Sequence, residues 1–345
     1  MSETLANIGE FGLIRRIKDL LNEVGVKAPR VTTGIGDDTA AFLPSPGYEL
    51  LVTCDAIVEG RHFLPQHITA IDLGRRAMTL NISDIGAMGG SPLYALISLG
   101  LKAETLVGDV EALYRGFVAE LNPFEAAIIG GNLTKSEGGL FIDITLIGQV
   151  EEGRAVKRST ARPGDAILVT GYPGRAAAGL QLLLRAGPGE DLRENPLVRA
   201  YNRPSHRAWE GRAIARTGCA TAMIDTSDGF LGDLGHICEE SRVGAELHKE
   251  RLPIDADLRK AALTLDLDPY TLVLHDSDDY ELIITCAPKD VGRIRDAVAR
   301  AAKGVAVTEV GQITDRAGHI TMLLPDGSSH SMRASGWDHF KGTVS

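Results

Sequence analysis

The sequence has few features of a secreted, membrane-embedded or metal-finger protein. Its four cysteines show no CxxC or other zinc-site spacing, so we expect reduced thiols. Cys54 lies beside Asp55 but has no neighbouring base that would lower its pKa, which argues against thiol catalysis. No apolar run is long enough to cross a bilayer, and the polar first ten residues do not resemble a signal peptide. We therefore predict a cytoplasmic protein that does not engage membranes.

Positive charge is also scarce. The chain has 36 Lys and Arg against 46 Asp and Glu, a formal net charge of −10. Proteins that bind nucleic acid non-specifically neutralise phosphates with clustered basic residues, and no such cluster is present here. The sequence also has no GxxxxGK[ST] loop, which excludes a P-loop kinase. We expect no nucleic-acid partner, and any bound phosphates must be held by other means.

The length of 345 residues predicts two domains. Strand-like apolar runs alternate with helical patterns, which predicts an α/β fold. The runs are Leu50–Thr53, Tyr94–Leu101, Ala126–Ile129, Leu140–Val150 and Ala166–Thr170. A helix is expected over Asp72–Met88, with Asn81 and Asp84 toward its end. Because the polar segment Arg158–Gly164 precedes a new strand, turn and helix unit, we place the domains at 1–150 and 151–345.

Three local patterns in the second half lead to further expectations. Gly171–Gly174 lacks the GxGxxG pattern, so we favour a plain turn between a strand and the helix Arg175–Arg185 over a phosphate loop. The Gly- and Pro-rich stretch Ala186–Asn202 predicts a surface excursion. Ala220–Ile224 predicts a buried strand that ends at Asp225, and Ser227 is expected to cap the following helix.

Aspartates recur in settings of glycine and small residues. The motifs are Gly-Ile-Gly-Asp37-Asp38, Thr53-Cys54-Asp55, Asn81-Ile-Ser83-Asp84, Asp225-Thr-Ser227-Asp228-Gly229 and Asp276-Ser-Asp278-Asp279-Tyr280. Several follow apolar runs, and a fold that gathers them must neutralise their repulsion with cations. Oxygen ligands favour Mg²⁺ over zinc. Single motifs can also be turn formers or helix caps, but together they indicate a magnesium site.

With these motifs in order, the chain resembles the thiamine-monophosphate kinase family, within the superfamily named for aminoimidazole ribonucleotide synthetase. The resemblance runs nearly end to end. It rests on Gly9–Ile14, Gly34–Asp38, Asp55, Glu59–Phe63, Asn81–Met88, Gly130–Asn132, Asp225–Gly229, Asp279–Leu282 and Gly336–Phe340.

The resemblance implies a fold, a reaction and a partner. The reaction is transfer of the ATP γ-phosphoryl group to thiamine monophosphate. The implied fold has two domains, an N-terminal one whose sheet completes a barrel across a homodimer and a C-terminal α/β sandwich. The 1–150 domain would bind ATP and Mg²⁺ and dimerise, and the 151–345 domain would complete the metal and substrate site.

The family pattern also assigns site residues. Mg²⁺ would be held by Asp38, Thr53, Cys54 (through its backbone), Asp55, Asp84, Asn132, Asp225 and Asp228. ATP would contact Gly131, Asn132, Arg158, Ser227 and Tyr114, and the thiamine half would contact His62, Asp278 and Trp337. Arg158 and Asp228 are the implied catalytic residues. The residue-level alternatives are a solvated linker arginine for Arg158, a structural histidine for His62 and a core-closing role for Trp337.

The chemistry agrees with this assignment. An acceptor phosphate is already anionic near pH 7, so its attacking oxygen needs no general base. Two polyanions must be brought together, and several Mg²⁺ ions held by aspartates would do this by direct in-line transfer.

Two positions depart from the commonest family pattern. Asn132 replaces an aspartate, and Asp276-Ser277-Asp278 replaces Gly-Gly-Glu, which puts the substrate fit of that loop in question. Three alternatives stay open: another superfamily enzyme with a different acceptor, a catalytically silent nucleotide-binding homologue and a Mg²⁺-dependent phosphohydrolase.

Overall fold

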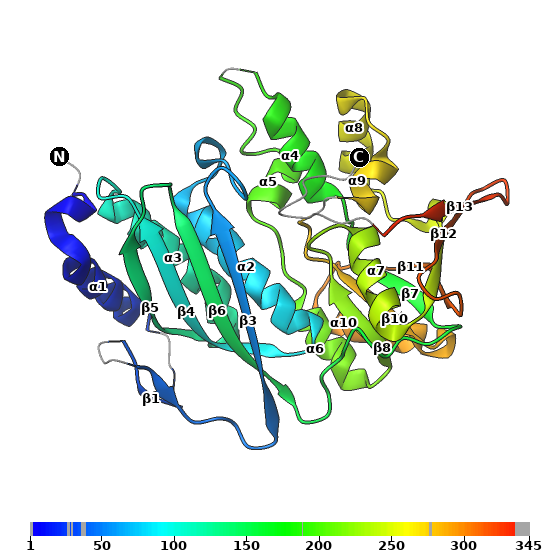
Figure 1. Ribbon diagram of the computed structural model, residues 1–345, viewed down its shortest axis with the longest axis horizontal. Coiled ribbons are helices and arrows are strands. Elements are labelled where there is room, and N and C mark those ends of the chain that lie inside the picture. The colour runs from blue at the N-terminus through cyan, green and yellow to red at the C-terminus, as the bar shows by residue number, and fades with distance from the viewer. Residues whose placement is uncertain are drawn as a thin grey trace. The chain divides into compact units, whose positions relative to one another are not determined.

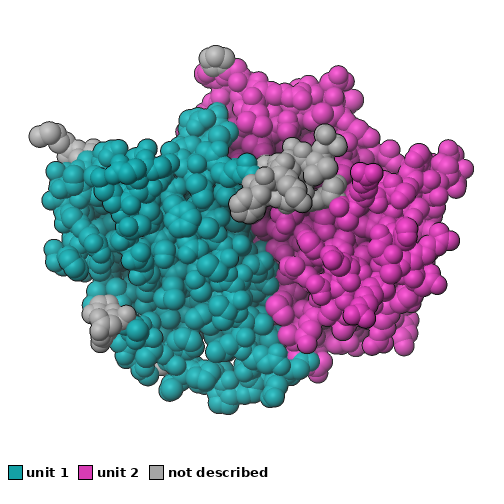
Figure 2. Space-filling view, viewed as in Figure 1, with its two compact units in different colours: residues 1–85, 90–153 teal, residues 86–89, 154–345 magenta. Residues whose placement is uncertain are grey.

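The computed structural model describes every residue except 1–2, 26–27, 29, 36–38, 188, 276–277 and 335–345. The chain divides into two compact units, Met1–Ile85 with Gly90–Gly153, and Gly86–Gly89 with Arg154–Ser345 (Figure 2). Each unit contains a sheet and several helices. The mixed α/β, two-domain architecture expected from the sequence is confirmed.

The first unit is built on a four-stranded sheet in the order β3-β6-β4-β5 (Figure 1). Its elements are α1 (Leu5–Val24), β1 (Val31–Thr33), β2 (Ala41–Phe42), β3 (Tyr48–Val58), α2 (Ala70–Ala87), β4 (Ser91–Leu101), α3 (Val107–Leu121), β5 (Ala127–Lys135) and β6 (Phe141–Glu151). β4 and β5 are parallel, whereas the other pairs are antiparallel. The four strands and the helix predicted for this half are confirmed.

The two faces of this sheet differ. Helices α2 and α3 lie on one face (Figure 1), where β6 contributes fully buried residues such as Ile144 and Leu146. The opposite face of the edge strand β3 is open, with Leu50 43% and Val52 66% exposed. Because side chains alternate along a strand, Leu50, Val52 and Cys54 point to this open face together. We call the exposed side of β3 from Leu50 to Ala56 the open face.

The second unit contains a seven-stranded sheet in the order β13-β12-β9-β11-β7-β10-β8. Its strands are β7 (Ala166–Thr170), β8 (Ala220–Asp225), β9 (Gly244–His248), β10 (Leu282–Cys286), β11 (Val307–Thr314), β12 (Ile320–Leu323) and β13 (Ser329–Met332). Its helices are α4 (Arg175–Arg185), α5 (Pro196–Asn202), α6 (Ala208–Thr217), α7 (Phe230–Ser241), α8 (Ala256–Leu265), α9 (Pro269–Leu274) and α10 (Val291–Ala301). The central strands β7 and β10 are buried at every residue, so apolar cores cover both of their faces.

Two local expectations for this half are wrong. The stretch Ala186–Asn202 is not wholly a surface excursion, because Asn195 caps α5 and the helix buries Leu197, Val198 and Tyr201. Ser227 does not cap α7: the N-cap is Gly229, and none of the described side chains caps this helix end. In the first case the Pro after Asn195 starts a helix rather than a loop.

Among the described residues, no helix combines the length and apolar character that a bilayer crossing needs.

Candidate active site

Three of the predicted metal ligands in the first unit lie on the helix-covered side of the sheet. The Thr53 hydroxyl on β3 donates a 2.5 Å hydrogen bond to the Asp84 carboxylate on α2. Asp55 lies two residues further along β3 and therefore shares the face of Thr53. The strand predicted over Leu50–Thr53 is longer than expected, since β3 continues past Asp55 to Val58. The fold thus brings Thr53, Asp55 and Asp84 to the same side of one sheet.

Cys54 and Asn132 lie on the other side of the sheet. The Cys54 thiol contacts Asp143 at 3.2 Å and Thr145 at 3.6 Å, both on β6. Asn132 pairs with Ser98, which in turn pairs with Asp143, so the register places it on the side of Cys54. β3 and β5 are opposite edges of the sheet, with β6 and β4 between them, a separation of roughly 14 Å. One ion therefore does not bridge Asp55 and Asn132 directly within this unit.

The Cys54 thiol is not an activated nucleophile. The Thr145 hydroxyl lowers its pKa, but burial and the neighbouring carboxylates of Asp143 and Asp55 outweigh this effect and raise the pKa above its usual value. A raised pKa leaves less thiolate, so the sequence-based argument against thiol catalysis is strengthened. With its side chain turned away from Thr53 and Asp55, Cys54 can join those ligands only through its backbone.

Gly131 occupies a position that no other residue fits. Its φ is +155°, and a Cβ there would come within 2.0 Å of the Ile97 carbonyl oxygen on β4. Gly131 and Asn132 are both exposed although they belong to β5. The family resemblance implies that this segment contacts ATP, and a ligand can approach an exposed glycine backbone of this kind closely.

His62 follows β3 in a tight turn. Its Nδ1 accepts a hydrogen bond of 3.0 Å from the Val58 amide, so the ring donates only through Nε2 when neutral. This contact fixes the orientation of the imidazole. It fits a residue that orients or contacts a ligand better than a proton-transfer catalyst.

In the second unit, the predicted ligands Asp225 and Asp228 flank the turn between β8 and α7. Asp225 is the last residue of β8, as the sequence predicts. The Asp228 amide donates to the Asp233 carboxylate at 3.3 Å. Asp233, in the first turn of α7, is only 1% exposed. Burial raises the pKa of Asp233 well above its usual value, and the negative charges of Asp225 and Asp228 raise it further.

Asp233 was not among the candidate site residues predicted from the sequence. It lies five residues after Asp228, in the first turn of the helix, and an acid in a first turn could have indicated it because it interacts favourably with the helix dipole. The mutual repulsion of these three acids shows an excess of negative charge in this part of the unit. A set of oxygen donors with this excess charge suits Mg²⁺.

The turn Gly171–Gly174 is not available to a phosphate. The Gly174 and Ala176 amides at the start of α4 donate to the Asp279 carboxylate at 2.5 and 2.8 Å. The helix N-terminus is therefore satisfied by the chain's own carboxylate. The preference for a plain strand-to-helix turn is confirmed.

The remaining predicted site residues do not form a further group of their own. Arg158 is exposed, accepts a 2.7 Å hydrogen bond from Ser241 at its carbonyl, and adds positive charge near Asp233. Tyr114 is buried on α3 in an edge-on contact with Phe117, and burial raises the pKa of its hydroxyl. The Ser227 carbonyl accepts a hydrogen bond from the Asp278 amide. The predicted residues Asp38 and Trp337 lie outside the described residues.

The described residues contain no ready-made cluster of three or more His, Cys, Asp or Glu side chains arranged as a metal site. The predicted ligands are divided between the two units. They also include a hydroxyl, an amide and a backbone group, and the assignment stays a prediction.

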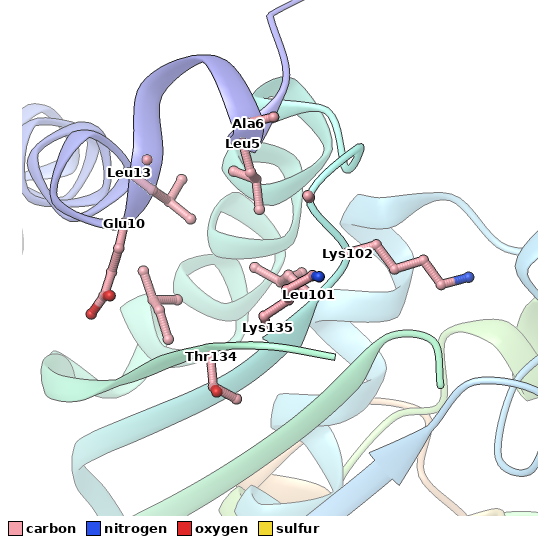
Figure 3. Close-up of a pocket in the computed structure, with 11 residues that line it drawn as sticks. Leu5, Ala6, Glu10, Leu13, Leu101, Lys102, Thr134 and Lys135 are labelled. Atoms are coloured by element: carbon pink, nitrogen blue, oxygen red, sulfur yellow. The ribbon is translucent and has the colours of Figure 1, made fainter. Parts of the chain in front are cut away.

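A separate cavity of about 230 Å³ lies in the first unit beneath α1 (Figure 3). Leu5 and Leu13 line it opposite Leu101, and Lys102 and Lys135 stand at its side (Figure 3). Helix α1 is interrupted at Gly9, whose φ is +69°. None of the eleven described residues that line this cavity is a predicted site residue.

Comparison with known proteins gives the family. Residues 36–150 match the family described as AIR synthase related protein, N-terminal domain, and residues 162–323 match its C-terminal domain. The thiamine-monophosphate kinase of Salmonella typhimurium is 35% identical over 334 residues, which cover 96% of this chain and 98% of that protein. The chain belongs to the thiamine-monophosphate kinase family. A second member, from Bacillus subtilis, is 32% identical over 90% of this chain and 94% of its own length.

Solved structures of the family agree. The thiamine-monophosphate kinase of Stenotrophomonas maltophilia K279a has a TM-score of 0.77 and 34% identity, covering 94% of this chain and 98% of that chain. The structure of AaThiL complexed with AMPPCP and TMP has a TM-score of 0.73 and 31% identity, covering 99% and 100%. The hydrogenase maturation protein HypE in complex with ATP, at 19% identity and a TM-score of 0.77, shares the fold.

Proposed function

We propose that this chain transfers the γ-phosphoryl group of ATP to thiamine monophosphate, giving thiamine diphosphate and ADP. The observation that supports this most is the match to thiamine-monophosphate kinases over nearly the whole chain. The related AaThiL binds AMPPCP, an ATP analogue, together with TMP. A kinase needs both ligands at once, and the two matched domains span all the predicted site residues except Arg158 and Trp337.

The transfer itself is a direct displacement. An oxygen of the acceptor phosphate forms a bond to the γ-phosphorus, while the bond from that phosphorus to the bridging oxygen breaks and ADP leaves with the electron pair. The acceptor oxygen is already anionic, so no side chain has to remove a proton. The protein therefore contributes positioning and charge neutralisation, and no phosphoenzyme is required.

We propose Thr53, Asp55 and Asp84 from the first unit and Asp225 and Asp228 from the second as the main Mg²⁺ ligands. Magnesium would supply neutralisation of the charge on the two phosphate groups. The oxygen-only donor set and the grouping of Asp225, Asp228 and Asp233 around one turn support a cation here. The Cys54 backbone, Asp38 and Asn132, whose side chain lies on the other side of the sheet, complete the proposed set. Because the proposed ligands lie on both sides of the sheet and in both units, we propose that more than one Mg²⁺ ion binds.

The chain's own residues have separate proposed roles. Gly131, Asn132, Ser227 and Tyr114 would contact ATP, while His62, Asp278 and Trp337 would contact the thiamine half. Arg158, exposed and close enough to Asp233 to affect its charge, would neutralise negative charge that develops during transfer. Asp228 would act through the metal. His62, held at Nδ1 by the Val58 amide, would present Nε2–H to a ligand.

We also propose a homodimer formed through the first unit. The open face presents Leu50 and Val52, and edge strands that expose apolar side chains in this way are normally covered. A second copy of the same sheet is a complementary cover, as in the barrel that the family resemblance implies. The open-face side chains of β3, which are Leu50, Val52, Cys54 and Ala56, carry no charge, and on the neighbouring strand β6 the Asp143 carboxylate contacts the Cys54 thiol.

A coupled assay of ADP release across several phosphorylated acceptors tests the reaction. We expect ADP that depends on both thiamine monophosphate and Mg²⁺, with thiamine diphosphate detected by ³¹P NMR. ADP release without an acceptor would favour the phosphohydrolase. Release only with another acceptor would favour a different superfamily enzyme, and binding of ATP without turnover would favour a silent homologue.

A further inference from the structure

The segment Asp278–Glu281, just before β10, has a strained backbone. Asp278 and Tyr280 have φ of +47° and +56°, in the left-handed region that non-glycine residues rarely adopt. The two side chains meet, since the Tyr280 hydroxyl donates to the Asp278 carboxylate at 2.9 Å. Such a conformation persists only where neighbouring contacts fix it.

On one side, this segment is bound to the metal motif. The Asp278 amide donates to the Ser227 carbonyl at 3.2 Å, and the Tyr280 amide donates to the Thr226 carbonyl at 2.9 Å. In return, the Thr226 amide donates to the Glu281 carbonyl at 2.7 Å, and the Thr226 hydroxyl accepts from the Glu281 amide at 3.0 Å. The position of Asp278 is thus linked directly to the turn that contains Asp225 and Asp228.

On the other side, the segment is held by a buried ion pair. Nε and Nη2 of Arg207 donate to the two carboxylate oxygens of Glu281, each at 2.6 Å. The side chains are only 17% and 7% exposed. The Thr170 hydroxyl, at the end of β7, donates to the same carboxylate at 2.6 Å. The planar guanidinium fork fixes both the place and the orientation of Glu281.

The Glu281 carboxylate lies against the backbone of Gly171. A Cβ on Gly171 would come within 1.9 Å of a Glu281 oxygen, so the absence of a side chain at 171 makes room for it. A second acid beside Arg207, Glu210, is also buried, with a carboxylate oxygen 3.8 Å from the Arg207 guanidinium. Without Arg207, Glu281 and Glu210 would be buried carboxylates that lack their cationic partner, and Glu281 would have to move.

We propose that Arg207 is a positioning residue, which through Glu281 holds Asp278 in register with the Ser227–Asp228 turn. This inference rests on the proposed function, in which Asp278 faces the thiamine half and the turn binds ATP and Mg²⁺. A misplacement of about 1 Å can cost about 10²-fold in rate. Arg207 would therefore set the distance between acceptor and donor without touching either of them.

A pair of variants separates positioning from mere stabilisation. Arg207→Met leaves Glu281 unpaired, so it should lower both stability and activity. The double variant Arg207→Met/Glu281→Met removes the carboxylate that Arg207 binds most closely and leaves only the more distant Glu210 without its cation, so part of the stability should return. If the pair positions Asp278, kcat/KM for thiamine monophosphate in the double variant stays at least tenfold below wild type, while the KM for ATP changes less than threefold. Recovery of kcat/KM together with the melting temperature would overturn the inference.

Arg75→Met is the matched control. Arg75 forms a partly buried ion pair with Glu120, at 2.8 Å, between α2 and α3 of the first unit. It should cost stability while leaving both KM values unchanged. The conservative variant Arg207→Lys, which keeps the charge but loses the fork, should fall between wild type and Arg207→Met in kcat/KM.

Amide hydrogen exchange without substrates tests the inference independently of the reaction. The Asp278 and Tyr280 amides should be protected in wild type and should exchange at least tenfold faster in the double variant. Unchanged protection would overturn the positioning role whatever the substrate proves to be. A wild-type protein that forms no thiamine diphosphate would overturn the proposed function, and the exchange result would still decide this inference.

Discussion

The two units hold their candidate acids in different ways. In the first unit, Thr53, Asp55 and Asp84 belong to the interiors of a strand and a helix, and the edge strand β3 is open on its other face. In the second, Asp225 and Asp228 flank a turn between a strand and a helix, and the central strands are buried on both faces. The candidate acids of the first unit therefore lie on regular elements beside exposed apolar side chains, whereas those of the second lie on a turn beside a fully buried part of its sheet.

The largest effect should come from removing one acid in each unit. Asp55→Ala and Asp228→Ala should each abolish turnover, a loss of about 10²- to 10³-fold or more, because each removes charge that neutral water cannot replace at the metal. The coupled ADP assay measures it, and circular dichroism checks that the fold is intact. If either variant kept near-native activity, that residue would leave the ligand set, and the two units would not both contribute an essential acid.

The next effect concerns the open face. Val52→Lys should weaken self-association at least tenfold, since a charge would replace an apolar side chain on the proposed dimer surface. Analytical ultracentrifugation over a concentration series measures this. Leu263→Lys is the control, because Leu263 on α8 of the second unit is 81% exposed. Equal behaviour of the two variants would mean that the open face is not an interface.

A smaller effect compares one glycine in each unit. Gly131→Ala and Gly171→Ala should each lower the free energy of unfolding by about 1–3 kcal/mol, because the added Cβ meets the Ile97 carbonyl or the Glu281 carboxylate. Urea titration measures both. Gly292→Ala on α10 is the control, since its Cβ meets nothing within 4 Å and should be neutral or stabilising. A neutral Gly171→Ala would show that Glu281 has room to move.

The smallest effect is a pH dependence in the second unit alone. Burial, with a contribution from Arg207, lowers the pKa of His206 to about 4. The unfolded chain, with a pKa near 6.5, then binds the proton more tightly than the native protein, so stability is lost as pH falls from 6.5 toward 4. His206→Asn should remove about 2 kcal/mol of the difference in unfolding free energy between pH 7.5 and 5. An unchanged slope in the variant would assign the acid sensitivity to other groups.

Much of the fold could be predicted from sequence, for physical reasons. β4 and β7 appear as continuous apolar runs because both faces of each are largely buried. Asp225 was found because a short apolar run ended at it. The strand predicted over Leu50–Thr53 was too short, since β3 continues past Asp55 to Val58 through alternating positions that a simple apolar run does not reveal. Helix α5 was missed because its first residues are those of a loop.

The site was predicted residue by residue from the family resemblance, without its spatial arrangement. The resemblance named Thr53 and Asp84 separately, but their contact depends on how α2 packs on the sheet, which is a long-range property. Asp233 and Arg207 were missed because each acts through a neighbouring residue rather than through a motif. That Asn132 and Asp55 lie on opposite sides of the sheet follows from strand register, which composition cannot give.

All four cysteines are described, and Cys54 alone is exposed while the other three are buried. Its thiol stands on the open face, among the side chains that a second copy would cover. The protein therefore has a built-in chemical reporter: the rate at which a maleimide labels this sulfur, followed as the sample is diluted, would track association without any added tag.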